Sequence, residues 1–235
     1  MALYSSVKRM IPAIRPFDLD PLWARLDAWL HGGVQPWELL QPLLGAPQVT
    51  AVVGAFYNFS WLFLVCAVAL WQAWAPRNAE SRTRFFAAYI LIWGLLGNLA
   101  AILLSSAGPV YYAEVTGEPG PYGPLLAYLH AAHAEAGNIA VILQDYLWQS
   151  HLGRDPAAGT GISAMPSVHI ATAFLFLLVA WDSGRWLRGF FAVYLALMLL
   201  GSVHLGWHYA LDGYLAIPAA WAIWWGAGRL VRAAR

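Results

Sequence analysis

The stretch S-V-H-L-G-W-H-Y-A-L-D, residues 202–212, places three ionisable side chains inside a long run of mostly apolar residues. His204, His208 and Asp212 recur at intervals of four, so on an α-helix they would share one face. Ionisable groups are costly inside a bilayer and usually have a function there. A second stretch, S-A-M-P-S-V-H at residues 163–169, opens another apolar run. We predict that the two stretches meet and form one site.

The composition around these stretches is that of an integral membrane protein. Of the 235 residues, 60% are hydrophobic and only 11% are charged, whereas soluble domains average about 25% charged residues. The formal net charge of +1 gives no basic patch for nucleic acid. The single cysteine, Cys66, excludes a disulfide within the chain.

Apolar runs long enough to cross a membrane define the fold class. A hydrocarbon core of about 30 Å requires roughly 20 residues of helix. We predict an all-α, polytopic helical bundle in the membrane, with spans at residues 49–75, 85–107, 164–181, 187–205 and 208–230. Residues 48–235 would form one membrane-embedded catalytic domain.

Two segments are too polar for a clear span. Residues 1–47 mix Trp and Leu with charged residues, glycines and prolines, and they predict short helices that lie at the membrane interface. Residues 108–163 form the longest non-spanning piece, in which residues 125–148 predict an amphipathic surface helix and residues 153–161 a loop.

Arginine positions predict the orientation. Three arginines lie in each of residues 76–84 and 229–235 and two in residues 182–188, whereas residues 108–163 contain only Arg154. By the positive-inside rule, the first three segments are cytoplasmic and both motif stretches lie at the extracytoplasmic surface. The basic residues of the N-terminal segment then lie on the outer side, so a sixth, less apolar span within residues 1–47 is the alternative.

The residue types at the predicted site suit phosphoryl transfer. Asp212 can accept the Nδ1 proton of His208 and leave its Nε2 free as a nucleophile. His169, from another helix, can protonate a leaving alkoxide and later activate the attacking group. The hydroxyls of Ser167 and Ser202, with the backbone N–H groups of nearby helix starts, are candidate phosphate ligands. This chemistry needs no metal and no cofactor.

These residues resemble those of a known family. P-S-V-H before an apolar helix (166–169), followed by Ser202, His208 and Asp212 at a helix junction, is similar to the second and third motifs of the type 2 phosphatidic acid phosphatase superfamily. The A-M-P-S-V-H and H-Y-A-L-D forms, with S-A-G-P-V-Y-Y at 106–112, resemble most its inositol phosphorylceramide synthase branch.

The resemblance implies an enzyme with His208 as nucleophile, Asp212 as its orienting partner and His169 as acid and base. It implies transfer of a phosphate or phospho-head group from a membrane phospholipid to water or to a lipid acceptor such as ceramide or diacylglycerol. The protein would lie in the cell inner membrane. Tyr111 and Tyr112 would line the head-group pocket or belong to an aromatic belt.

The chain lacks basic residues that the superfamily motifs contain. Val203 occupies the position where the third motif has Arg, and the first motif has no clear counterpart. His204 and Arg154 are candidate replacements.

Two other functions remain open from the sequence alone. One is a metal-dependent hydrolase in which His204 and His208, with His169 or Asp212, bind zinc. The other is a lipid transporter or binding protein, although transport sites usually lie at the membrane midplane rather than near one surface.

Overall fold

The computed structural model describes residues 2–74, 79–154 and 161–234. Within these residues the chain forms α-helices with short 3-10 and π segments, and no strand. The prediction of an all-α helical bundle is therefore confirmed. Arg77, from the predicted basic turn, and residues 155–160, from the predicted loop, lie outside the described residues.

The five predicted spans are all helical and occur in the predicted order. They are α4 (Pro47–Ala55), η1 (Phe56–Ser60) and α5 (Trp61–Trp74); α6 (Ala79–Leu91), η2 (Ile92–Ala100) and α7 (Ala101–Leu103); α11 (Val168–Ala180); α12 (Arg185–His204); and α13 (Ala210–Ala233). By length and composition, three helices are long and apolar enough to cross a membrane: Pro47–Trp74, Ala79–Leu103 and Arg185–His204.

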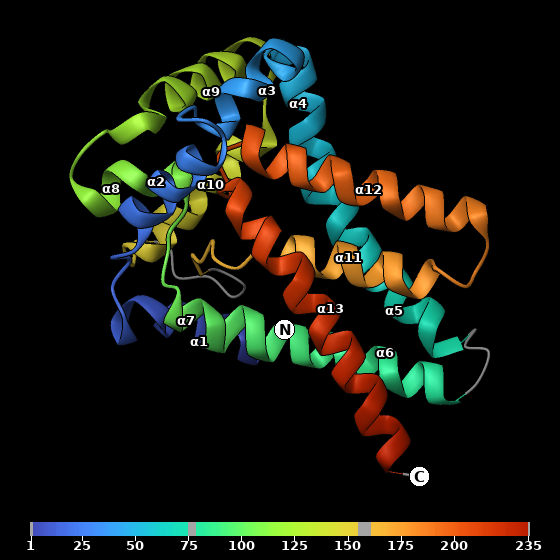
Figure 1. The fold of residues 1–235 in the computed structure, drawn as a ribbon. Helices are drawn as coiled ribbons and strands as arrows, with labels where there is room; N and C mark the ends of the chain where they lie inside the picture. The colour runs from blue at the N-terminus through green and yellow to red at the C-terminus, as the bar shows by residue number, and fades with distance from the viewer. Residues whose placement is uncertain (1, 75–78, 155–160, 235) are drawn as a thin grey trace.

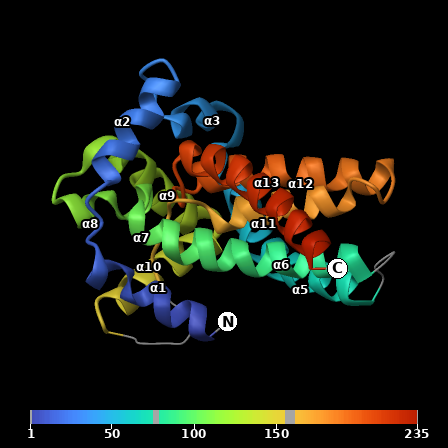
Figure 2. The same ribbon diagram turned by 60° about the horizontal axis from the view of Figure 1, so that its bottom comes forward.

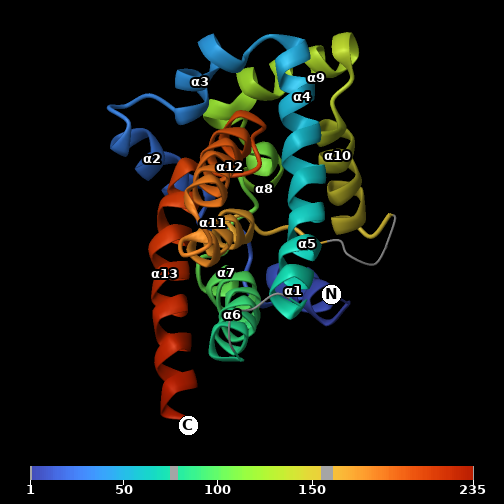
Figure 3. The same cartoon turned by 90° about the vertical axis from the view of Figure 1, so that its right-hand side faces the viewer.

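The apolar helix α11 lies at the centre of the bundle. It contacts α5, α6, α12 and α13, and Figure 3 shows α13 and α4–α5 on either side of α11 and α12. It begins at Val168 rather than at the predicted Ala164, because Pro166 lacks the N–H of a helix interior and the Ser167 hydroxyl accepts the N–H of Ile170 as an N-cap. This start fixes where His169 faces.

The shorter helices gather at one end of the bundle. They are α1 (Ala2–Ile14), α2 (Asp20–Leu30), α3 (Pro36–Leu44), η3 (Pro109–Tyr111), α8 (Tyr112–Thr116), η4 (Gly120–Tyr122), α9 (Gly123–Ala136) and α10 (Ile139–His151). Figures 1 and 2 show α2, α3, α8, α9 and α10 at the end opposite to the α11–α12 turn and the C-terminal end of α13. Each is shorter than the roughly 20 residues of a span, so residues 2–46 contain no single helix of spanning length.

The single surface helix predicted at residues 125–148 is wrong. The structure divides it into α9 and α10 at Gly137 and Asn138. Gly137 has φ +70°, a conformation that favours glycine and ends α9. The Asn138 side chain accepts the N–H of Ala140 at 3.0 Å and caps α10. The apolar periodicity continues through both helices, so the sequence pattern gives no sign of the helix end at Gly137.

Candidate active site

Three segments outside the α-helices meet at the motif residues: residues 104–111, 161–167 and 205–209. Ala164 N–H donates to the carbonyl of Ser106 at 2.9 Å, and Val110 N–H donates to the carbonyl of Gly206 at 2.9 Å. Gly108 has φ +95°, and a Cβ there would lie 2.7 Å from the Trp207 carbonyl oxygen, so only glycine permits this approach. The stretches 163–169 and 202–212 therefore meet, as predicted.

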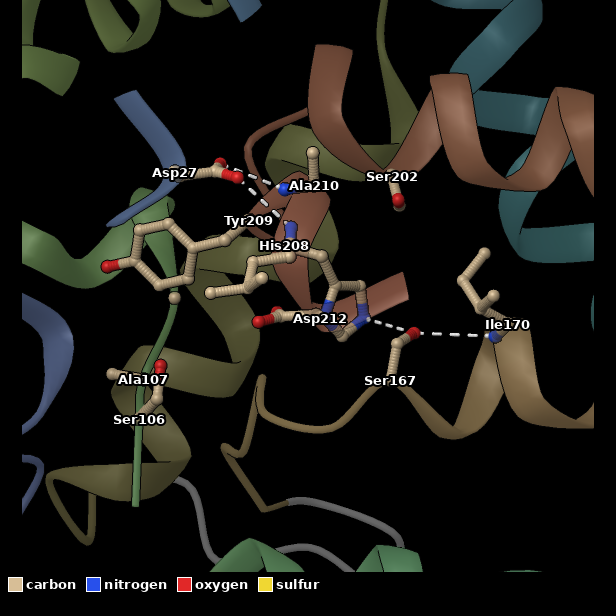
Figure 4. Close-up of polar contacts among 12 residues, drawn as sticks. Asp27, Ser106, Ala107, Ser167, Ile170, Ser202, His208, Tyr209, Ala210 and Asp212 are labelled. Atoms are coloured by element: carbon tan, nitrogen blue, oxygen red, sulfur yellow. Dashed lines mark hydrogen bonds and ion pairs between the residues drawn. The ribbon is translucent and has the colours of Figure 1, made fainter. Parts of the chain in front are cut away.

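The His208–Asp212 pair is formed and buried. His208 Nδ1 lies 2.9 Å from Asp212 Oδ2, and both side chains are almost fully shielded from solvent. His208 precedes the first residue of α13 by two positions, and Asp212 lies in the first turn of that helix. The carboxylate therefore holds the ring through Nδ1, so that Nε2 faces the loop carrying Ser167 (Figure 4).

Ser167 and His169 come to the same place from the start of α11. Ser167 Oγ lies 3.2 Å from His208 Nε2 and also caps α11. The rings of His169 and His208 are 6.0 Å apart between centroids. His169 packs on Tyr57 and Trp61, at 5.1 and 4.0 Å between centroids. The two histidines thus lie next to each other on the wall of one cavity.

A cavity of about 340 Å³ opens in front of the two histidines. Its wall is mostly apolar and aromatic and includes Tyr57, Trp61, Trp93, Tyr111, Tyr146 and Trp207. Tyr57 and Trp93 come from the π segments η1 and η2, and such segments often occur at functional sites. A cavity of this size with a few converging polar groups is typical of a ligand site.

Of the other predicted ligands, only Tyr111 lies on the cavity wall. Its hydroxyl donates to the Gln144 carbonyl at 2.9 Å, and its ring stacks on Trp148. Tyr112 packs near Tyr122 instead, beside a separate recess with Arg25 and Pro121.

Three further predicted residues lie outside the cavity wall. The Ser202 hydroxyl donates to the Leu199 carbonyl at 2.8 Å, and its backbone carbonyl accepts the N–H groups of Trp207 and His208. Arg154 is exposed and donates to Gln149. His204 Nε2 lies 2.9 Å from Thr50 Oγ1.

The break at residues 205–209 separates His204, at the end of α12, from His208. The helical face shared by both histidines, which the spacing suggested, is therefore not formed. Within the described residues, no three His, Cys, Asp or Glu side chains cluster in a way that could hold a metal ion.

Two buried carboxylates of α2 hold the site loops. Asp20 accepts hydrogen bonds from the Ser106 hydroxyl, from the N–H groups of Ala107 and Gly108, and from the Tyr209 hydroxyl, all at 2.8 to 2.9 Å. Burial raises the pKa of the Asp20 carboxyl, and these hydrogen bonds oppose that shift. Asp20 thus joins residues 106–108, which precede η3, to Tyr209, which follows His208.

Asp27 acts on the helix that carries Asp212. Its carboxylate accepts the N–H groups of Ala210 and Leu211, at 2.9 and 3.0 Å (Figure 4). These are first-turn donors of α13 that the helix itself cannot satisfy. Burial raises the pKa of Asp27, opposed by the same two hydrogen bonds. Neither aspartate is among the site residues predicted from the sequence, although the stretch D-P-L-W-A-R-L-D, with Asp20 and Asp27 at its two ends, was the available signal.

The fold and the site define a helical integral membrane protein with a buried His–Asp pair and a second histidine at a cavity. A model of the PAP2 superfamily matches residues 23–226, which is most of the chain. The protein therefore belongs to the PAP2 superfamily, whose members are phosphatases and phosphotransferases. No curated protein and no solved structure matches the chain.

Proposed function

We propose that the protein transfers a phosphate or phospho-head group from a membrane phospholipid, through a phosphohistidine on His208 and without a metal ion. The observation that carries this proposal is the His208 geometry: Nδ1 is held by Asp212 at 2.9 Å, Nε2 lies 3.2 Å from Ser167 Oγ, and the side chains of His208 and His169 line the same cavity. A histidine held in this way keeps its lone pair on Nε2.

The first half-reaction forms a bond between His208 Nε2 and phosphorus and breaks the phosphorus–oxygen bond to the leaving lipid. His169 gives its proton to the leaving alkoxide. Asp212 stabilises the positive charge that develops on the His208 ring. Ser167 Oγ, which lies 3.2 Å from Nε2, turns to donate its proton to a phosphate oxygen.

The second half-reaction reverses these roles. His169, now neutral, takes the proton of the attacking hydroxyl, the oxygen bonds to phosphorus, and the bond to Nε2 breaks. The acceptor hydroxyl belongs to water in a phosphatase and to a lipid such as ceramide or diacylglycerol in a transferase. The motif forms A-M-P-S-V-H and H-Y-A-L-D favour the lipid acceptor, as in the inositol phosphorylceramide synthase branch.

We place this reaction at the extracytoplasmic face of the cell inner membrane. The site lies at the end of the bundle with the short helices, opposite to the arginine-bearing ends of α6, α12 and α13. Arginine-rich ends face the cytoplasm under the positive-inside rule.

The test is product analysis by mass spectrometry. Purified protein receives a panel of phospholipids with and without ceramide or diacylglycerol, in buffer with chelator, beside a His208→Ala variant. A new phospholipid that forms only with the acceptor identifies a transferase, and phosphate or phospho-head group released without it identifies a phosphatase. A product that persists in His208→Ala, or that requires zinc, would contradict the phosphohistidine mechanism.

A further inference from the structure

The N-terminal helix α1 places a cation at the cavity of the two histidines. Lys8 lies on the cavity wall together with His169 and His208. It is the only Lys or Arg among the described residues that line this cavity. Lys8 and His169 are close enough for their charges to interact. A phosphate group in this apolar cavity would therefore meet one positive side chain.

The position of Lys8 follows from how α1 packs. Ile11, one turn further along α1, is fully buried in a small core with Phe17, Ala107 and Ile162. Residues three apart share a helix face, so Lys8 also faces inward, whereas Arg9 is exposed. Gly161 allows the approach, because a Cβ there would lie 3.0 Å from Lys8 Cγ.

The Lys8 ammonium lacks a countercharge in this position. Within the described part of the chain, its side chain forms no ion pair, and no Asp or Glu lines the cavity. Desolvation lowers the pKa of Lys8 to about 8, as expected for a half-buried ammonium without an anion beside it. An anionic ligand would supply the missing partner.

Neutral donors on the same wall also lack partners. The Tyr57 hydroxyl and the Trp207 indole N–H are buried without a hydrogen-bond acceptor among the described residues, and both residues line the cavity. Buried donors normally find an acceptor. One cation and two unpartnered donors are the groups that bind the oxygens of a phosphate.

We propose that Lys8 binds the phosphate group of the substrate beside His208, so that α1 supplies the cation that Val203 and the missing first motif do not. This inference rests on the proposed function for the identity of the substrate. The binding of an anion does not depend on it and is tested separately.

The first test is calorimetric titration of the purified full-length protein with tungstate, a phosphate mimic that stays doubly charged from neutral to alkaline pH. Lys8→Gln should weaken tungstate binding by about ten- to a hundredfold, the usual loss for a charged hydrogen bond. Lys8→Arg should keep the affinity within about threefold, since it keeps the charge. Arg9→Gln, the neighbouring exposed cation, is the matched control and should bind as wild type.

The second test is the pH dependence of the same binding. Lys8 carries its charge below its pKa of about 8, so wild-type affinity should fall as the pH rises from 7.5 to 9.5, about tenfold per pH unit at the upper end. Lys8→Arg should lack this fall. The other groups around Lys8 are Arg9 and the side chains His151, His169, His208, Tyr57, Tyr111 and Tyr146. These groups are present in both proteins, so the difference between the two profiles belongs to Lys8.

The outcomes separate this proposal from the proposed function. Tungstate binding that depends on Lys8, without lipid turnover, supports the anion site and contradicts the proposed lipid reaction. If His208→Ala abolishes turnover but Lys8→Gln leaves it intact, the proposed role of Lys8 is contradicted and the proposed function is not. Equal tungstate affinity in wild type and Lys8→Gln, or identical pH profiles in wild type and Lys8→Arg, would overturn the inference.

Discussion

The pairing of His208 with Asp212 predicts how a change at Asp212 affects His208 Nε2. Asp212→Asn keeps the shape of the side chain, but an amide can present its N–H to Nδ1 and move the imidazole proton to Nε2. With Nε2 protonated the nucleophile is lost, so kcat should fall by about three to four orders of magnitude, as for a comparable His–Asp pair in a serine protease. The measurement is steady-state turnover of the lipid substrate, with tungstate affinity as the control for an intact cavity. A kcat within tenfold of wild type would contradict the role of Asp212.

His204 has a different environment, and the structure predicts a different phenotype. Its Nε2 bonds to Thr50 Oγ1, and its Nδ1 has no partner among the described residues. His204→Ala should lower the melting temperature, because it removes one hydrogen bond at a cost of about 0.5 to 1.5 kcal/mol, while the Thr50 hydroxyl keeps its bonds to the Leu44 carbonyl and to the Tyr128 hydroxyl. Turnover should fall less than tenfold.

Thr50→Val removes the same hydrogen bond from the other side, together with the bonds of the Thr50 hydroxyl to the Leu44 carbonyl and to the Tyr128 hydroxyl. The two changes together should cost less than the sum of the separate changes in stability, since both break the hydrogen bond between His204 and Thr50. If His204→Ala is as inactive as His208→Ala, either the nucleophile or the metal-free mechanism is assigned wrongly.

At the scale of the helix, α13 depends on a residue far away in the sequence. Asp27 accepts two N–H groups of its first turn across 183 and 184 positions of chain. Asp27→Ala should destabilise the protein by about 0.5 to 2 kcal/mol, the range for a lost N-cap. It should also lower kcat, because Asp212 lies in that first turn.

Glu38→Ala is the control for Asp27→Ala, since Glu38 is an exposed carboxylate on the neighbouring helix α3. Melting temperature and turnover should both stay at the wild-type value in this control. An Asp27→Ala protein with full turnover would mean that the start of α13 holds Asp212 without the cap.

The elements that the sequence predicted well are those encoded by local patterns. The five apolar helical segments follow from apolar runs, and the contact between Ser167 and His208 agrees with the prediction that the two motif stretches meet. The contacts of Asp20, Asp27 and Lys8 were missed because each joins segments distant in the sequence, and no local pattern records such a partner. The break at Gly137 was missed because the apolar period continues through it.

For the whole molecule, the N-terminal basic residues affect how its orientation in the membrane is predicted. Lys8, Arg9, Arg15 and Arg25 precede the first long helix and would lie outside under a five-span topology. The structure gives two of them hydrogen-bond partners: Arg15 donates to the Leu103 carbonyl at the end of α7, and Arg25 donates to the Pro21 carbonyl. Lys8 lines the cavity. Cations that serve helix ends and a site are a poorer guide to topology than those in short loops between spans.

The orientation itself is testable with single cysteines in a Cys66→Ala background. Glu118 is exposed between α8 and η4, at the end of the bundle with the short helices, whereas Asp182 is exposed in the α11–α12 turn at the other end. A membrane-impermeant maleimide should label Glu118→Cys in intact cells and Asp182→Cys only after permeabilisation, because the arginines that follow Asp182 favour the cytoplasm. Inside-out vesicles are the control and should reverse the pattern. The opposite labelling would place the His208 cavity at the cytoplasmic face, and the phospholipid substrate would then come from the inner leaflet.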